Sequence, residues 1–316
     1  MTIMVTGCAG FIGSHMIDKL LDKGKTVIGI DNFDQFYDQS IKIKNIEHNL
    51  DNKNFIFYRA DIREKEQMEK IFHDNEIDTL IHLAARAGVR PSIQDPLLYE
   101  DVNVRGTINL LELGRKHNIR KLVFGSSSSL YGINEEIPFR EDDPVDKTIS
   151  PYAASKKACE IFCYTYHHLY GIPITSLRFF TVYGPRQRPE MAIHKFTRLI
   201  DQNKIIEMYG DGRSRRDYTY ISDIVDGIMA AVDRKLGYEI INLGNSNVVE
   251  LRQLIHLIEK NLGKSAIIKK LPDQPGDVPV TYADISKAQK LLGYKPKVRI
   301  DEGIENFVNW YRGVAK

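Results

Sequence analysis

The chain of 316 residues has the length and composition of a globular protein with one large domain and an additional lobe. Hydrophobic residues make up 42% and charged residues 27% of the sequence, and 44 basic side chains nearly balance 42 acidic ones, for a net charge of +2. This balance gives no sign of a nucleic-acid or membrane surface. No apolar run reaches the roughly 20 residues that span a bilayer, and no charged segment precedes the first apolar run as in a signal peptide. We therefore expect a soluble, cytoplasmic protein.

The cysteines support the same compartment. There are three, Cys8, Cys159 and Cys163, and this odd, sparse set argues against a disulfide framework and for a reducing environment. Cys159 and Cys163 are four residues apart and share a helix face. We predict that they serve packing and expect no metal site.

The first half of the chain alternates short apolar runs with amphipathic helical patterns. Strands are predicted near residues 3–5, 27–30, 55–57, 80–81 and 122–124, and helices near 16–23, 64–74 and 102–117. This alternation predicts an α/β fold, a Rossmann-type doubly wound parallel sheet with helices on both faces. Two later apolar runs, 174–177 and 239–242, are expected to extend the sheet.

The alternation of predicted strands and helices changes after Tyr183-Gly184-Pro185, where Gly, Pro and Arg become frequent. We predict a dinucleotide-binding domain of residues 1–183 with 217–249. Residues 184–216 with 250–316 are predicted to form a smaller, C-terminal substrate-binding lobe.

The first predicted strand runs into a turn with glycines at positions 7, 10 and 13, followed by a helical pattern. Glycines at this spacing allow a sharp turn, close approach of a pyrophosphate and close packing of the helix on the sheet. The helix N-terminus then offers free N–H groups to phosphate. Since a glycine motif alone is weak evidence, a tight turn without a ligand is the alternative.

Acidic residues at the ends of later strands strengthen the case for a dinucleotide. Asp31 ends the second strand, where its carboxylate would bind a ribose diol and repel a 2′-phosphate, which favours NAD over NADP. Asp61 follows the third strand and is placed to hold adenine, although it would equally serve as a helix cap. The expected NAD site comprises Gly7, Gly10, Phe11, Ile12, Gly13, Asp31, Asn32, Asp61, Ile62, Leu83, Ala84, Ala85, Tyr152 and Lys156.

Tyr152 and Lys156 lie four residues apart in a segment that is expected to be helical from 151 to 170. They therefore share a face, and an ammonium beside a phenol favours the phenolate, a base for a sugar hydroxyl. The pair alone is common, and two solvated side chains at a helix N-terminus are the alternative.

The combination of these motifs is more specific. Gly7/Gly10/Gly13, Asp31, His82-Leu-Ala-Ala85, the serine run 126–129 ending in Tyr131-Gly132, and Tyr152-x-x-x-Lys156 resemble the extended short-chain dehydrogenase/reductases that act on nucleotide sugars. The resemblance covers essentially the whole chain. It implies that Ser127 hydrogen-bonds the reacting sugar hydroxyl beside Tyr152.

The serines after Ser127 discriminate between reactions within that family. Its 4,6-dehydratases carry an Asp-Glu pair at the corresponding positions, and its UDP-glucuronate decarboxylases keep a Glu. This sequence has Ser128 and Ser129. The missing acids favour epimerisation over elimination.

Downstream segments resemble the UDP-uronic acid 4-epimerases, namely residues 87–90, 177–189, 210–218 and 274–277. The resemblance implies that Arg216 grips the UDP diphosphate, Tyr209 packs on uracil and Asp277 binds the uridine ribose. Gln274 stands where many UDP-galactose epimerases have a second arginine. Thr181 and Arg188 are expected to hold the C6 carboxylate, and Arg90 and Ser128 complete the expected substrate set; alternatively, all the arginines serve the diphosphate.

We therefore expect a homodimeric isomerase that converts UDP-glucuronate to UDP-galacturonate through a 4-keto sugar, with bound NAD. The dimer is expected from the resemblance, through helices 95–117 and 151–170 paired in a four-helix contact. Alternatives are a UDP-glucose or UDP-N-acetylglucosamine 4-epimerase, a UDP-glucuronate decarboxylase and a non-catalytic NAD-binding protein.

Overall fold

The computed structural model describes residues 1–272 and 278–314. The chain forms two compact units, each assembled from separate stretches of sequence. Unit 1 comprises residues 1–133, 143–178 and 225–241, and unit 2 comprises 134–142, 179–224 and the remainder from 242. The domain boundaries given above remain a prediction, and the two units are described in turn.

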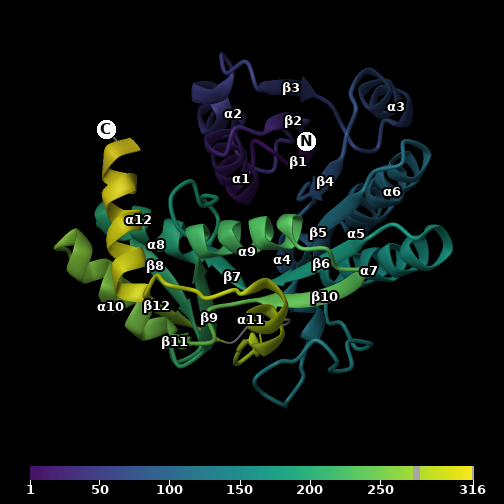
Figure 1. The fold of residues 1–316 in the computed structure, drawn as a ribbon. Coiled ribbons are helices and arrows are strands. Elements are labelled where there is room, and N and C mark those ends of the chain that lie inside the picture. Colours follow the sequence, from purple (N-terminus) through teal and green to yellow (C-terminus); the bar gives the residue numbers. More distant parts are fainter. Residues whose placement is uncertain (273–277, 315–316) are drawn as a thin grey trace. The chain divides into compact units, whose positions relative to one another are not determined.

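Unit 1 is built on a seven-stranded sheet in the order β10-β6-β5-β4-β1-β2-β3 (Figure 1). The pairings of β1 with β2 and β4, of β2 with β3 and of β4 with β5 are all parallel. The order reverses between β1 and β4, which is the strand order of a doubly wound Rossmann-type fold and confirms the predicted fold class. The strands are β1 (Thr2–Thr6), β2 (Thr26–Asp31), β3 (Phe55–Arg59), β4 (Thr79–His82), β5 (Lys121–Ser127), β6 (Ile174–Phe179) and β10 (Tyr238–Leu243).

The helices predicted between these strands are confirmed. The pattern near 102–117 contains two elements, a π-helical turn η2 (Glu100–Arg105) and the helix α6 (Gly106–Lys116). The other helical segments are α1 (Phe11–Asp22), α2 (Gln39–Ile46), η1 (Glu47–Asn49), α3 (Lys65–Asp74), α4 (Val89–Gln94), α5 (Pro96–Tyr99), η3 (Ser128–Tyr131), α7 (Pro151–Tyr170) and α9 (Ile221–Asp233), of which residues 225–233 belong to unit 1.

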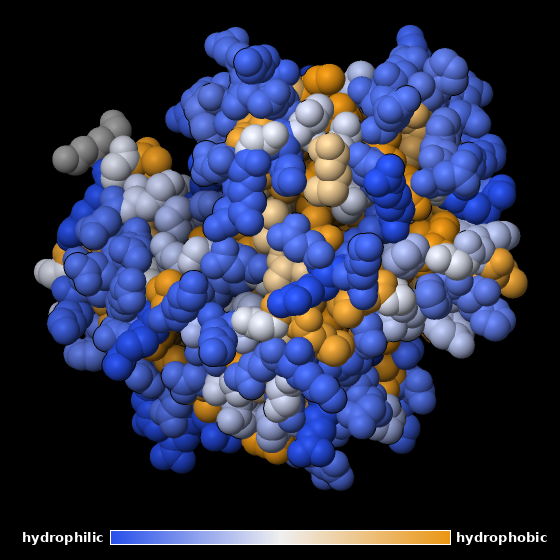
Figure 2. Space-filling view, viewed as in Figure 1, coloured by the Kyte–Doolittle hydropathy of each residue, from blue (hydrophilic) through white to orange (hydrophobic). Residues whose placement is uncertain are grey.

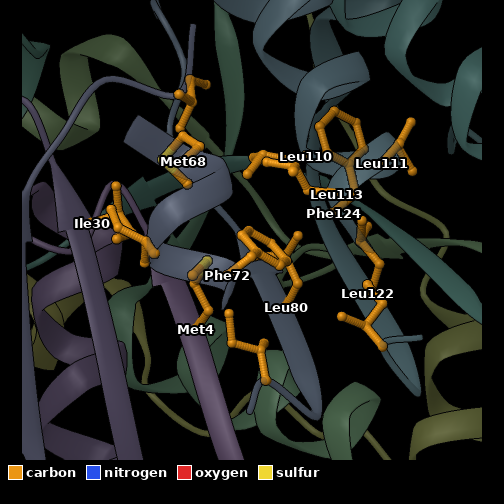
Figure 3. Packing of buried hydrophobic residues seen from close by; sticks show 14 of the residues in the cluster. Met4, Ile30, Met68, Phe72, Leu80, Leu110, Leu111, Leu113, Leu122 and Phe124 are labelled. Atoms are coloured by element: carbon orange, nitrogen blue, oxygen red, sulfur yellow. The ribbon is translucent and has the colours of Figure 1, made fainter. Parts of the chain in front are cut away.

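The helix α6 packs against both α3 and α7, and these helices bury a large apolar cluster on the sheet. Figure 3 shows Met4 and Leu80 of the sheet beneath Phe72 of α3, with Leu110 of α6 alongside. Cys159 and Cys163 of α7 are buried in the same cluster, which confirms their predicted packing role. Burial raises the pKa of both thiols, so they stay protonated and apolar.

Lys121, the first residue of β5, is buried and ties this strand to the C-terminus of α9. Its Nζ donates hydrogen bonds to the carbonyls of Ala231 at 2.8 Å, Val232 at 3.0 Å and Arg234. A positive charge at the negative end of a helix dipole is favourable, and here it also satisfies carbonyls that lack an intrahelical partner. The start of β5 is therefore fixed, while its other end carries the serine run.

Unit 2 contains a three-stranded sheet in the order β11-β9-β7 and a parallel pair of β12 with β8. The strands are β7 (Thr181–Tyr183), β8 (Ile205–Tyr209), β9 (Arg215–Tyr220), β11 (Val248–Glu250) and β12 (Ile267–Leu271). The helices are α8 (Ala192–Asp201), α10 (Leu251–Leu262), α11 (Ser286–Leu292) and α12 (Ile300–Val314), and α10 packs against both α8 and α12.

The surface in view in Figure 2 is largely hydrophilic, with hydrophobic residues interspersed. Among the described residues, no helix combines the length and apolar character needed to cross a membrane.

Candidate active site

The three glycines of the first turn have distinct structural roles. Gly7 has φ +71°, and a Cβ there would lie 2.8 Å from the backbone nitrogen of Ala84. A Cβ on Gly13 would lie 2.0 Å from the carbonyl oxygen of Gly7, so only glycine lets α1 approach the turn. The turn therefore needs glycine both for its left-handed conformation and for close backbone contact.

The N-terminus of α1 is open. Its N-cap residue is Gly10, which supplies no capping side chain, and the first intrahelical bond runs from the Ser14 N–H to the Gly10 carbonyl at 3.0 Å. The N–H groups of Phe11, Ile12 and Gly13 precede that bond and have no intrahelical acceptor. Free amides, the positive end of the helix dipole and the absence of a capping side chain fit a pyrophosphate group.

Asp31, at the end of β2, is buried and organises the backbone around this turn. One carboxylate oxygen accepts from the Ala9 N–H at 3.1 Å and the other from the Phe33 N–H at 2.8 Å. Burial raises the pKa of Asp31, although Lys42, with its Nζ 3.8 Å away, and the two amides oppose this shift. Each oxygen keeps a further lone pair, so the geometry is compatible with the predicted ribose contact, which remains a prediction.

Asn32 and Asp61, predicted separately for the cofactor site, lie together. The Asn32 side-chain amide donates to Asp61 at 2.8 Å, and Arg63 donates to both Asp61 oxygens and to Asp101. Burial works against ionisation, but the hydrogen bonds from Arg63 and Asn32 dominate and lower the pKa of Asp61 to about 2. Asp61 accepts from the Arg63 N–H within a turn and does not cap α3. The neighbouring Ile62 side chain is buried in the core.

The segment Leu83–Ala85 follows β4 beside the glycine turn. The Ala84 N–H donates to Thr6 Oγ1 at 3.3 Å, and the Leu83 N–H donates to the Thr6 carbonyl at 3.2 Å. His82 is hydrogen-bonded through Nδ1 to Thr6 and through Nε2 to Thr107. Burial, aided by the charge of Lys156, lowers the pKa of His82 to about 3, so the ring is neutral and structural.

Ser127 ends β5, and α7, which carries Tyr152 and Lys156, packs against β5 and η3. Ser127 Oγ accepts from the Ser129 N–H at 3.2 Å and is hydrogen-bonded to Ser129 Oγ at 2.9 Å. Lys156 is buried, its Nζ donates to the Gly125 carbonyl at 2.7 Å, and it lies 4.8 Å from the Phe124 ring centroid. The predicted catalytic residues therefore come from two elements that are in contact.

Asn103, in the π-helical turn η2, is a contributor that the sequence analysis missed. Its side chain accepts from the Arg86 N–H at 2.7 Å, and it donates to the Arg86 carbonyl at 3.0 Å and to Ser155 Oγ at 2.9 Å. Ser155 Oγ donates in turn to the Tyr152 carbonyl at 2.8 Å. Asn103 thus links the chain after Leu83–Ala85 to the helix turn of Tyr152. The interruption of a helical pattern by Asn is only a weak sequence signal for such a role.

Unit 2 carries most of the predicted substrate residues. Thr181 begins β7 and pairs with Tyr218 of β9, so Thr181 and Arg216 lie on neighbouring strands. Tyr209 ends β8 in the other sheet, and its hydroxyl lies 3.5 Å from Glu207. Asp277, like Gln274, lies outside the described residues. The other three predicted substrate residues belong to unit 1: exposed Arg90 in α4, Ser127 at the end of β5 and half-buried Ser128 in η3.

Arg188 lies in a loop that is held by hydrogen bonds of the neighbouring residue, Gln187. Buried Gln187 donates to the Val182 carbonyl at 3.1 Å and accepts from the His194 N–H at 3.2 Å. His194 Nδ1 lies 2.6 Å from the Gln187 carbonyl, and burial lowers the pKa of this histidine. The Arg188 Nε lies 3.1 Å from a carboxylate oxygen of Glu190.

A family comparison now adds to this geometry. The sequence profile of the family described as GDP-mannose 4,6 dehydratase matches residues 4–307. The chain belongs to this family.

Relatives within the family narrow the comparison. A UDP-glucuronate 4-epimerase from Thermodesulfobacterium geofontis is 47% identical over 308 residues, covering 97% of this chain and 95% of the relative. The crystal structure of a Bacillus cereus UDP-glucuronic acid 4-epimerase in complex with UDP-glucuronic acid and NAD matches with a TM-score of 0.94 and 39% identity, covering 99% of this chain and 100% of that chain. A UDP-glucose 4-epimerase from Thermotoga maritima with UDP-glucose matches with a TM-score of 0.93 and 33% identity, covering both chains fully at 100%.

Next to Arg216, Asp217 is a fully buried carboxylate that joins three segments of unit 2. It accepts from the N–H groups of Asn245 at 2.7 Å, Ser246 at 3.0 Å and Ala283 at 3.2 Å, and from the Thr219 hydroxyl at 3.3 Å. Burial nevertheless raises its pKa from 3.8 to about 6, since these bonds only partly offset the desolvation.

We predict that Asp217→Asn makes the slope of the unfolding free energy against pH more positive between about pH 4 and pH 6. Because the folded-state pKa of Asp217 lies above its unfolded value, this group binds more protons in the folded than in the unfolded protein in this window. Its contribution to the wild-type unfolding free energy should therefore fall as pH rises, by up to about 3 kcal/mol. Urea unfolding across this range measures the slope.

The variant also loses hydrogen bonds, so the diagnostic quantity is the slope and not the absolute stability. Asp211→Asn, which alters an exposed carboxylate of the same unit, serves as the matched control and should keep the wild-type slope. The same slope in wild type and Asp217→Asn would show that Asp217 titrates at an ordinary pKa.

Proposed function

We propose that the protein is an NAD-dependent 4-epimerase that interconverts UDP-glucuronate and UDP-galacturonate. The observation that carries this proposal is the convergence of Ser127 with the helix of Tyr152 and Lys156, without a carboxylate at positions 128 and 129. Similarity to UDP-glucuronate 4-epimerases over nearly the whole chain supports the substrate.

The cofactor-binding part of the proposal rests on unit 1. NAD, when bound, supplies the chemistry of accepting a hydride from sugar C4 and returning it to the opposite face. We assign its pyrophosphate to the glycine turn and the N–H groups of Phe11, Ile12 and Gly13, and its adenosine half to Asp31, Asn32 and Asp61. The fit of the open helix N-terminus to an anionic group supports this assignment.

Tyr152 is assigned the role of general base toward the sugar 4-hydroxyl, and of acid when the proton returns. Lys156 supports the phenolate with a positive charge whose place is fixed by the bond to the Gly125 carbonyl. That bond uses one of the three donors of the ammonium. Since Tyr152 and Lys156 occupy successive turns of α7, they share one face of the helix.

Ser127 is assigned the role of hydrogen-bond donor to the reacting oxygen. The Ser129 amide and hydroxyl both lie within hydrogen-bond distance of Ser127 Oγ, so that oxygen serves as an acceptor for Ser129. The hydroxyl proton of Ser127 is then available to a substrate oxygen. Elimination of water would need an ionisable acid and base at the next two positions, and the hydroxyls of Ser128 and Ser129 do not supply them.

Unit 2 is assigned the binding of the UDP-sugar. Arg216 suits a diphosphate, because a guanidinium donates in bidentate fashion, and Tyr209 offers an aromatic face for uracil. We assign Thr181 and Arg188 to the C6 carboxylate. Oxidation at C4 makes that carboxylate part of a β-keto acid, which loses carbon dioxide easily, so an epimerase must hold it in a conformation that resists this loss.

A homodimer in a reducing cytoplasm completes the proposal. Three apolar side chains of α4, α5 and α7 are well exposed: Ile93 of α4 at 52%, Leu97 of α5 at 78% and Ile161 of α7 at 54%. Both α4 and α5 pack against α7, so these residues belong to one helical region of unit 1. Pairing this region with a second copy would bury them. All three cysteines are free thiols, which is compatible with the cytoplasm.

We predict that the purified protein, incubated separately with UDP-glucuronate, UDP-glucose and UDP-N-acetylglucosamine, turns over UDP-glucuronate most efficiently. NMR analysis should identify UDP-galacturonate as the product. UDP-pentose and carbon dioxide as the main products would instead establish a decarboxylase, and preference for either neutral sugar would establish one of the other epimerases.

Tyr152→Phe should lower kcat by about 10²- to 10⁴-fold, because the variant loses the group that transfers the 4-hydroxyl proton. Calorimetry should show unchanged affinity for UDP and NAD. Tyr170→Phe, at the exposed end of the same helix, is the matched control and should keep wild-type kinetics. Wild-type turnover by Tyr152→Phe would remove this residue from the mechanism.

Leu97→Glu should convert the proposed dimer to a monomer, because it places a charge in the apolar contact. Sedimentation velocity measures this change. Ile205→Glu alters an exposed apolar side chain of β8, outside the helices proposed for the contact, and this control should stay dimeric. A monomeric wild-type protein at micromolar concentration would contradict the dimer.

A further inference from the structure

Unit 1 contains a buried ion pair close to the serine run. Arg178 of β6 donates from Nε to one carboxylate oxygen of Glu160 at 3.0 Å and from Nη2 to the other at 2.9 Å. Their side chains are 1% and 2% exposed. Removing two charges from water is costly, and an apolar pair of similar volume would often be as stable.

The carboxylate of Glu160 accepts a third hydrogen bond, from a residue near the end of β5. Ser126 Oγ donates to Glu160 Oε1 at 2.6 Å, and Ser126 immediately precedes Ser127. Gly125, the residue before Ser126, accepts the hydrogen bond from Lys156. Two successive residues of β5 are therefore held by two successive turns of α7, Gly125 by Lys156 and Ser126 by Glu160.

Arg178 extends the network to the other end of the serine run. Its Nη1 donates to the Tyr131 hydroxyl at 3.0 Å, and its guanidinium lies 4.9 Å from the Tyr131 ring centroid. Tyr131 is the last residue of η3. Ser127 is the N-cap residue of η3, and Ser126 immediately precedes it. The ion pair thus contacts the chain on both sides of residues 127–130.

The network also determines what Lys156 binds. Lys156 and Glu160 are four residues apart in α7, the spacing that favours a lysine–glutamate pair. Both oxygens of Glu160 are instead engaged by Arg178, and one also by Ser126. The Lys156 ammonium instead binds the Gly125 carbonyl, and it lies on the face of α7 that carries Tyr152.

We propose that Glu160 and Arg178 are positioning residues for the reaction, which fix Ser127 relative to Tyr152 and Lys156 through Ser126 and Tyr131. This inference rests on the proposed function. Because small displacements of reacting groups reduce rates strongly, a fixed register between β5 and α7 is a functional requirement, and the charged network provides it in a directional form that apolar packing does not.

Ser126→Ala is the mildest test, since it removes one hydroxyl from a buried site and leaves the ion pair intact. We expect kcat per NAD-loaded subunit to fall by about 10- to 100-fold. The KM for UDP-glucuronate and the Kd for UDP from calorimetry should change by less than about twofold. Hydrogen exchange, followed by mass spectrometry, should accelerate in peptides covering 125–132.

The matched control is Thr175→Val, in β6 three residues before Arg178. The Thr175 hydroxyl is buried and has no hydrogen-bond partner in the described part of the chain. This variant should keep both the wild-type kcat and the wild-type exchange of peptides 125–132.

A second pair of variants tests whether Ser126 and Arg178 act together in one network. Arg178→Lys keeps the charge but loses the bidentate geometry, and it should also lower kcat. The double variant Ser126→Ala/Arg178→Lys should lose less than the product of the two single losses, because both changes disturb the hydrogen bonds of Glu160. Losses that multiply would show that Ser126 and Arg178 act independently and would overturn the proposal.

The proposal is also overturned if Ser126→Ala keeps wild-type kcat and exchange, whatever its urea midpoint. Failure of the proposed function is separately visible, because then the wild-type protein itself does not epimerise UDP-glucuronate. In that case hydrogen exchange of residues 125–132 still reports whether the network fixes this segment.

Discussion

The hydrogen bond from the Lys156 ammonium to the Gly125 carbonyl is the constraint on which the candidate active site depends. A buried ammonium must be satisfied by oxygen atoms, and here the acceptor is a backbone carbonyl two residues before Ser127. The register of α7 against β5 follows from this contact. Since Tyr152 lies one turn before Lys156, the same contact restricts where the helix turn of Tyr152 lies relative to the end of the strand.

The rest of unit 1 places that contact at a useful edge of the sheet. Parallel strands end at a common edge, so the turn after β1, Asp31 after β2, Asp61 after β3, Leu83–Ala85 after β4 and the serines at the end of β5 belong to one side of the fold. The reversal of strand order between β1 and β4 leaves the glycine turn open to a ligand. The proposed cofactor and proton-transfer groups thus come from a single compact unit, whereas most groups assigned to the UDP-sugar come from the other.

Buried charges have a recurring role in both units, since each holds together segments that are distant in sequence. Lys121 joins the start of β5 to the end of α9, and Asp31 joins the glycine turn to the chain after β2. The pair of Glu160 and Arg178 brackets the serine run, and Asp217 joins β9 to the segments at 245 and 283. Buried charge is costly unless fully hydrogen-bonded, so each of these groups permits few alternative arrangements of its segments.

The sequence by itself determined the fold class and the elements of the sheet, and it predicted the candidate cofactor turn and the pair of Tyr152 and Lys156. These depend on local patterns: period-two and period-3.6 apolar spacing, glycines at a turn and i,i+4 pairs on a helix. The role predicted for Ser127 came from the family resemblance. The packing role of Cys159 and Cys163 was also predictable, because their surroundings are apolar.

Only the tertiary structure decided the partners of single polar atoms. Examples are Asn103 bound to the Arg86 backbone, Asp61 bound by Asn32, and Ser126 bound to Glu160. These contacts join residues 17 to 34 positions apart. Such contacts arise when separate elements pack, and a hydrogen bond depends on distances of tenths of an ångström that no sequence pattern specifies.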